Sequence, residues 1–214
     1  MPQNSHVEAF SDEDQQQALH PAASTGAAVS EFYRLRQSGS ELARNLPWQP
    51  NVHSSGWIVK QRHELDVTLR PLLATLHAPV PKASASDDFH WLHDNVRLLY
   101  SELQATADAV KPLSKIPHAY TSNGESIPRA AGVAEEFLLA AGFKFSEPAF
   151  NAYVQGFQET TVLDVKELWA LVSCLKIILL KEIASLGQRV LADTESVHGV
   201  AVCIRSLRDI AETS

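Results

Sequence analysis

The chain has 214 residues, of which 45% are hydrophobic and 20% charged, so it is long enough to bury a substantial core. Its 25 acidic and 18 basic residues give a formal net charge of -7, which repels a phosphate backbone and excludes general nucleic-acid binding. With 9 glycines and 11 prolines, the composition favours a mostly helical protein over a loop-rich or all-β one.

Neither a secretory signal nor a membrane span is expected. The N-terminal residues are polar and acidic, without a basic stretch followed by an apolar one. The most apolar run, residues 168–180, is interrupted by Ser173 and Lys176 and is shorter than the roughly 20 residues that cross a bilayer. We therefore expect this chain to be soluble and cytoplasmic.

The N-terminal part is predicted to hold a tail and two helices. Residues 1–27 contain few large apolar side chains and are predicted to form a disordered tail, which leaves 28–214 as a helical domain. A short helix is expected to begin near residue 29, followed by a loop over 45–56 and a helix over 57–69. Pro71 is expected to kink that helix or to start a new turn that ends near His77. By composition, residues 78–86 form a linker and a sub-boundary of the domain.

The longest clean helix is predicted to begin after residue 86 and to run to about residue 110. Ser86 provides an N-cap, and Asp87 and Asp88 provide an acidic first turn. The apolar stripe of this helix has the helical period and comprises Trp91, Leu92, Val96, Leu99 and Leu103. Farther on, Asn123-Gly124 predicts a turn, but the alternation around it is too weak to predict a hairpin.

The C-terminal part is predicted to be helical throughout. One helix begins at Pro128 and stops at Gly142, and the next is capped by Ser146. Asp164 and Glu167 resemble a capping box at the start of a helix over 165 to about 186, which is apolar on nearly every side and is therefore predicted to be central. A last helix covers about 195–210. The expected fold is an all-α bundle of about six to eight helices.

No catalytic pattern is recognisable in the chain. No serine lies in G-x-S-x-G, and no glycine-rich loop follows a strand. His90, His93 and Asp94 share a helical face, but the rest of a zinc signature is missing, so we assign neither a metal site nor a cofactor. Cys174 and Cys203 lie in apolar helical patterns and are predicted to be buried free thiols.

Aromatic side chains are the candidates for sugar binding. Trp91 and Trp169 lie within apolar helical stripes and are predicted to pack in the core. Trp48 and Trp57 flank a loop and are predicted to be the more exposed pair. Together with Tyr120, they are the candidate substrate-binding residues.

Four segments resemble a region of the bacterial cyclic β-1,2-glucan synthases. FHWLHDNV at 89–96 resembles the W-L-x-D-N helix near the start of those enzymes, and TVLDVKELWAL at 161–171 resembles their L-x-x-x-E-L-W-A-L helix. Ile127-Pro128-Arg129 is similar to a Y-P-R position between them, with isoleucine in place of tyrosine. IRSLRDI at 204–210 is similar to the S-L-R-x-I segment that follows. The resemblance covers the chain from about residue 87 onward.

This resemblance implies a non-catalytic, N-terminal accessory region that packs against the remaining domains of a parent enzyme. The parent would be an inner-membrane glycosyltransferase that uses UDP-glucose and carries a cyclising region and a phosphorylase domain related to glycoside hydrolase family 94. None of the catalytic residues of those domains lies in this chain. The alternative is a helical module that binds β-1,2-glucan. The first function predicts an uncovered apolar or aromatic patch, and the second predicts a groove lined by exposed aromatics.

Overall fold

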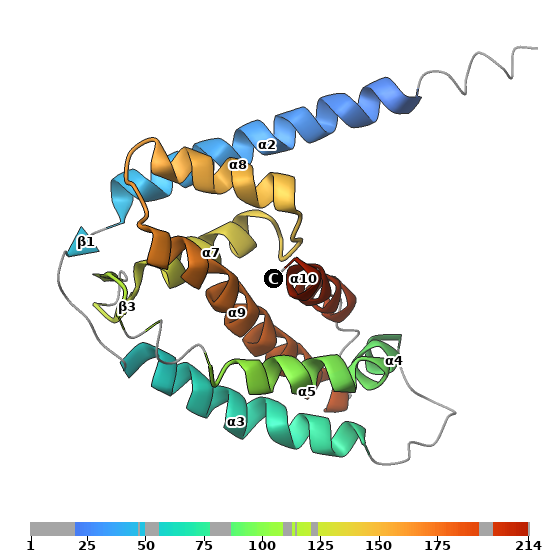
Figure 1. Ribbon diagram of the computed structural model, residues 1–214. Coiled ribbons are helices and arrows are strands. Elements are labelled where there is room, and N and C mark those ends of the chain that lie inside the picture. The colour runs from blue at the N-terminus through green and yellow to red at the C-terminus, as the bar shows by residue number, and fades with distance from the viewer. Residues whose placement is uncertain are drawn as a thin grey trace, which may run out of the picture.

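The computed structural model describes residues 20–46, 48–49, 56–77, 87–108, 113, 115–120, 124–192 and 199–213, with side chains from residue 29 onward except at 48 and 49. Eight helices and one small sheet make up this part of the chain (Figure 1). The predicted helical fold is confirmed. None of the helices in the described ranges is both long and apolar enough to span a membrane.

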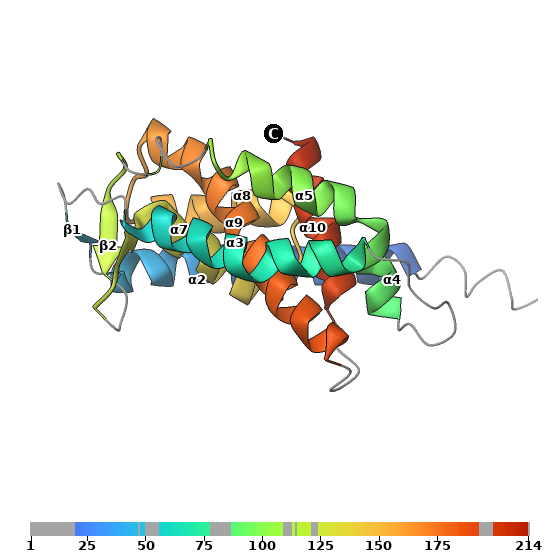
Figure 2. The same cartoon turned by 90° about the horizontal axis from the view of Figure 1, so that it is seen from below.

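One long helix organises the others around it. The helices are α2 (His20–Asn45), α3 (Gly56–Leu76), α4 (Asp87–Asp94), α5 (Val96–Ala105), α7 (Arg129–Ala140), α8 (Glu147–Gln158), α9 (Val165–Leu191) and α10 (Val200–Glu212). Helix α9 contacts α3, α4, α5, α7 and α10, which confirms the central position predicted for it. Figure 1 shows α3 and α5 on one side of α9 and α7 on the other, and in Figure 2, seen from below, α3 crosses in front of α9.

Helices α2 and α8 pack side by side at a distance that only glycine permits (Figure 1). A Cβ atom at Gly39 would lie 2.1 Å from the carbonyl oxygen of Tyr153, and one at Gly156 would lie 1.9 Å from the carbonyl oxygen of Arg36. Both distances are far below van der Waals contact. The two glycines therefore set how closely these helices approach.

Helix α2 begins earlier than predicted, whereas α3 ends at Leu76, close to the end expected near His77. Helix α2 begins at His20, inside the predicted tail, and the rest of that tail (residues 1–19) lies outside the described residues. The alanine-rich start of α2 has a high helix propensity, which does not depend on a buried face. Helix α3 continues through Pro71 without ending, because the four leucines of its last two turns are buried and offset the lost backbone bond. The predicted linker, residues 78–86, also lies outside the described residues.

The prediction of one helix over residues 87 to about 110 is wrong. The structure has two helices there, which meet at Asn95. The side-chain Nδ2 of Asn95 donates to the carbonyl oxygen of Trp91 at 2.7 Å, the acceptor that the backbone N–H would reach in a continuous helix. The backbone N–H of Asn95 bonds instead to the carbonyl oxygen of Leu92 at 3.3 Å. Helix α5 then ends at Ala105, short of the end predicted near residue 110.

A three-stranded antiparallel sheet contains a hairpin that the sequence did not predict. Strands β1 (Trp48–Gln49), β2 (His118–Tyr120) and β3 (Ser126–Pro128) lie in that order, and Ala119 pairs with both outer strands. Gly124 has a φ of +75°, as the predicted turn requires. Strands of two or three residues are too short to show a readable alternation.

The predicted caps of the C-terminal helices are confirmed. Ser146 Oγ accepts a hydrogen bond from the backbone N–H of Ala149 at 3.4 Å, and Asp164 forms a complete capping box at the start of α9. Gly142 ends α7 with a φ of +59°. Helix α9 begins at Val165 as predicted but extends to Leu191, and α10 begins at Val200, later than the start predicted near residue 195. Both cysteines are buried and free, as predicted.

Candidate functional site

A buried ion pair joins the start of α7 to the start of α9. The Nε of Arg129 donates to Glu167 at 2.7 Å, the Nη2 of Arg129 bonds the other carboxylate oxygen, and the two side chains are 3% and 0% exposed. Arg129 Nη2 also donates to the carbonyl oxygen of Val162 at 3.0 Å, and Glu167 accepts from the backbone N–H of Asp164 at 2.9 Å. Each charge is therefore both paired and hydrogen-bonded, as burial demands.

A second polar contact joins α4 to α10. The guanidinium of Arg208 donates to the side-chain oxygen of Asn95, and the guanidinium of Arg205 lies 5.3 Å from the centre of the Trp91 ring. Beside them on α10, Ser206 Oγ donates to the carbonyl oxygen of Phe143 at 2.8 Å. The four segments that resemble the glucan synthases thus meet in pairs: 127–129 contacts 161–171, and 89–96 contacts 204–210. Polar side chains in these segments hold the helices together.

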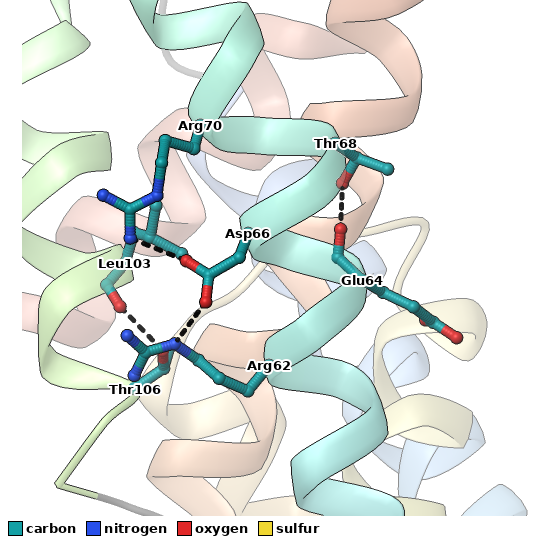
Figure 3. Close-up of polar contacts among 7 residues, drawn as sticks. All are labelled: Arg62, Glu64, Asp66, Thr68, Arg70, Leu103 and Thr106. Atoms are coloured by element: carbon teal, nitrogen blue, oxygen red, sulfur yellow. Dashed lines mark hydrogen bonds and ion pairs between the residues drawn. The ribbon is translucent and has the colours of Figure 1, made fainter.

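A small ionic network lies on the side of α3 that faces Leu103 and Thr106, in and just after α5 (Figure 3). Asp66 accepts hydrogen bonds from Arg70 at 2.7 Å and from Arg62 at 3.3 Å. The hydrogen bond from Arg70 is the main cause that lowers the pKa of Asp66 below its ordinary value. Both pairs connect neighbouring turns of one helix, which indicates a contribution to the stability of α3.

A polar cleft of about 520 Å³ lies between α3, α7 and α9. Lys60 bonds Glu125 at 2.8 Å on one side of it. On another side, Lys181 bonds Gln61 and lies 3.0 Å from Glu64. The cleft is lined by both charged and apolar side chains, namely Trp57, Lys60, Gln61, Glu64, Glu125, Ile127, Glu135, Leu139, Phe143, Ile178, Lys181, Glu182 and Ser185.

The electrostatic balance of this cleft is negative, with four carboxylates and two ammonium groups in its lining. Burial, with the neighbouring Glu136 as a further cause, raises the pKa of Glu135 above its ordinary value. Sequence reasoning did not single out Glu135, Lys181 or Glu182 as site residues. Charged residues on three separate helices give no signal that they face one another across a cleft.

The three predicted sugar-binding residues lie toward one end of the molecule. Trp57, in the first turn of α3, lines the polar cleft but is only 9% exposed, so the prediction of an exposed side chain is wrong. The reason is that α3 packs against β3. Tyr120 is half-buried at the end of β2, and Trp48 pairs through its backbone with Ala119 in the neighbouring strand. Their role in binding sugar stays a prediction.

An uncovered apolar surface lies at the start of α9. Trp169, predicted to be a core residue, is 78% exposed, and Val162 and Val165 are 74% and 61% exposed. The prediction was wrong because the described helices pack on other faces of α9 and leave this one open. Beside Trp169 is a hollow of about 400 Å³ lined by Leu113, Lys115, Lys166, Trp169, Ala170 and Ser173.

The histidines of α4 have ordinary surroundings. His93 Nδ1 lies 3.3 Å from an Asp94 carboxylate oxygen, and its ring stacks on Phe89 with 6.4 Å between ring centres. His90 borders a shallow hollow that also contains Trp91. In the described part of the chain, no group of three or more His, Cys, Asp or Glu residues is placed to hold a metal ion.

No protein-family model matches the chain. Over 158 residues it is 26% identical to the cyclic beta-(1,2)-glucan synthase NdvB of Rhizobium meliloti (strain 1021). The two proteins are distantly related. The match covers 73% of this chain but 6% of the synthase, so the chain spans a small fraction of the length of its relative.

Proposed function

We propose that this chain is a non-catalytic accessory region of a cyclic β-1,2-glucan synthase-like glycosyltransferase and that it packs against the rest of that enzyme. The observation that carries this proposal is the extent of the similarity, which includes most of this chain and a small part of a very long synthase. A region of that kind would contribute folding and contacts to the enzyme, with the synthesis of glucan from UDP-glucose carried out by other domains.

The polar contacts inside the helical domain support a structural role. The most buried ionic groups, Arg129 and Glu167, neutralise each other and bond to nearby backbone. Asn95 and Arg208 bond each other across two helices. Catalytic groups need an approach for substrate, and the Arg129–Glu167 pair has none because both side chains are almost fully buried.

The uncovered apolar surface at the start of α9 supports packing against another part of an enzyme. Soluble proteins expose single apolar residues routinely, but a tryptophan and two valines together beside an apolar hollow indicate a contact site. Tryptophan is also among the residues most enriched at the energetic centres of interfaces.

The direct test is to ask whether glucan synthesis accompanies this chain. Membranes of the source cells are solubilised in detergent and immunoprecipitated with an antibody raised against this chain, and the precipitate is incubated with radiolabelled UDP-glucose. We expect the precipitate to form β-1,2-glucan, and a precipitate made with pre-immune serum to form none. Synthesis that stays in the supernatant while the chain is in the precipitate would contradict the proposal.

A second function, binding of β-1,2-glucan, is favoured by one observation: the polar cleft combines hydrogen-bonding side chains with Trp57. Sugars are bound through such polar groups together with an aromatic surface. Because Trp57 is only 9% exposed, it offers a sugar little aromatic surface for stacking.

Fluorescence separates this second function from the first. The full chain is titrated with β-1,2-gluco-oligosaccharides to millimolar concentration while tryptophan emission is followed. Binding in the cleft predicts a shift that is lost in Trp57→Phe and kept in Trp169→Phe. No shift at millimolar sugar would exclude the cleft as a glucan site.

A further inference from the structure

Three exposed apolar residues form what we call the α9 surface: Val162, Val165 and Trp169. Val165 and Trp169 are one helical turn apart and therefore lie on the same side of α9, and Val162 directly precedes the helix. Beside Trp169, the hollow contains two buried apolar side chains, Leu113 and Ala170. This combination offers a protruding indole next to a recess that can receive one large apolar side chain.

The backbone beneath the α9 surface is fixed by buried polar contacts. The Nη2 of Arg129 donates a hydrogen bond to the carbonyl oxygen of Val162 at 3.0 Å. The capping box between Asp164 and Glu167 holds the first turn of α9, with 2.8 Å from the Glu167 backbone nitrogen to an Asp164 carboxylate oxygen. A surface that is ordered before binding loses less conformational entropy when a partner arrives. The buried ion pair therefore also positions this surface.

The edge of the hollow is positively charged on a chain whose net charge is -7. Lys115 and Lys166 both border the hollow, and neither forms an ion pair with another described residue. The two carboxylates at the start of α9 are already bound, that of Asp164 in the capping box and that of Glu167 to Arg129 and to the backbone of Asp164. The N-terminal end of a helix adds a partial positive charge at the same place. A partner that is complementary to this surface would therefore carry acidic as well as apolar side chains.

We propose that the α9 surface binds an acidic polypeptide segment from the rest of the synthase, which inserts a large apolar side chain into the hollow beside Trp169. This proposal rests on the proposed function and names the contact through which the packing occurs. A second copy of this chain is a poor occupant. Two copies of the same surface in a symmetric pair would place Lys115 and Lys166 against like charges, and both chains carry the same net negative charge.

Photo-crosslinking in the native full-length polypeptide tests this contact. The crosslinking amino acid p-benzoylphenylalanine replaces Val165, membranes are irradiated, and the crosslinked peptide is identified by mass spectrometry. We expect a peptide from outside this chain that contains aspartate or glutamate next to a large apolar residue. The matched control replaces Tyr33, which is 72% exposed on α2, and is expected not to yield that peptide.

Charge reversal tests the acidic character of the partner. The double variant Lys115→Glu/Lys166→Glu is expected to lower the crosslink yield at Val165 by about fivefold, because two rim charges become repulsive. Lys144→Glu, an exposed lysine after α7, is expected to leave the yield unchanged. Equal crosslink yields in the two variants would overturn the proposal that the partner is acidic.

Crosslinking of the Val165 position to a second copy of this chain, to the same peptide as the Tyr33 control, or to nothing would overturn the docking proposal. These outcomes are separable from a failure of the proposed function. If only the docking proposal for the α9 surface is wrong, the immunoprecipitate still synthesises glucan while the crosslink is missing. If the synthase assignment is wrong, glucan synthesis is absent whatever the crosslink shows.

Discussion

Replacing Arg129 by methionine removes one half of the buried ion pair while keeping an unbranched side chain of similar length. The variant leaves the carboxylate of Glu167 inside the protein with its backbone partner at Asp164 and without its counter-ion. It also removes the hydrogen bond to the carbonyl oxygen of Val162. The structure therefore predicts a large loss of stability from one substitution of a buried side chain.

The expected loss follows from the burial of the pair. Breaking a buried ion pair by removing one partner costs about 3–5 kcal/mol, because the remaining charge has neither water nor a counter-ion. Domains of this kind are stable by about 5–15 kcal/mol, so the change is a substantial part of the total. With a urea m value of about 2–3 kcal/mol/M, the unfolding midpoint should fall by about 1–2.5 M.

Urea unfolding followed by far-UV circular dichroism measures this loss. The control is Arg36→Met, because Arg36 also pairs with a glutamate, Glu159, but the two side chains are 54% and 46% exposed. An exposed pair contributes about 0–1 kcal/mol, so this control should change the midpoint little. The double variant Arg129→Met/Glu167→Leu should regain part of the loss, because no charge is left buried. Equal midpoints for Arg129→Met and Arg36→Met would refute the reasoning.

Three other predictions concern the packing, the pH dependence and the thiols. Gly156→Ala should cost more than about 2 kcal/mol in urea unfolding, because the new Cβ would lie 1.9 Å from the carbonyl oxygen of Arg36, whereas Gly132→Ala, with its nearest side-chain atom 3.4 Å away, should be near neutral. The pKa of Asp66 is lowered in the folded state, so its stabilising contribution is present above the unfolded pKa of about 3.9 and is lost as the pH falls through the lower folded value. The difference in stability between wild type and Asp66→Asn at pH 7 should therefore shrink as the pH falls below the unfolded pKa, and a difference that stays constant through this range would contradict this cause. Burial raises the pKa of Cys203 to about 12, so a disulfide reagent at about pH 8 should react with it far more slowly in the native protein than in urea; equal rates would show that the thiol is accessible.

Local signals in the sequence predicted the helices whose ends are set by local chemistry. Ser146, Gly142 and the Asp164–Glu167 capping box each act within a few residues, so their patterns could be recognised before the structure. The apolar side chains on nearly every side of α9 likewise predicted its central position. These features depend on neighbours along the chain and not on the rest of the fold.

Features that depend on distant residues could not be predicted in the same way. The break at Asn95 is accompanied by a bond to Arg208, which lies 113 residues farther along the chain. The apolar stripe of α9 predicted a buried Trp169, but a stripe does not show whether another helix of this chain covers it. The polar cleft needs three helices to meet, and no pattern within one helix indicates that. The candidate site was therefore less predictable than the fold.

The size of the native polypeptide tests the central claim most directly. An antibody against this chain is used to probe membrane and soluble fractions of the source cells by immunoblot. A region of a cyclic β-1,2-glucan synthase predicts a band in the membrane fraction many times heavier than the 23.5 kDa of this chain. A soluble band at 23.5 kDa, with nothing heavier, would contradict the claim that this chain is part of a synthase.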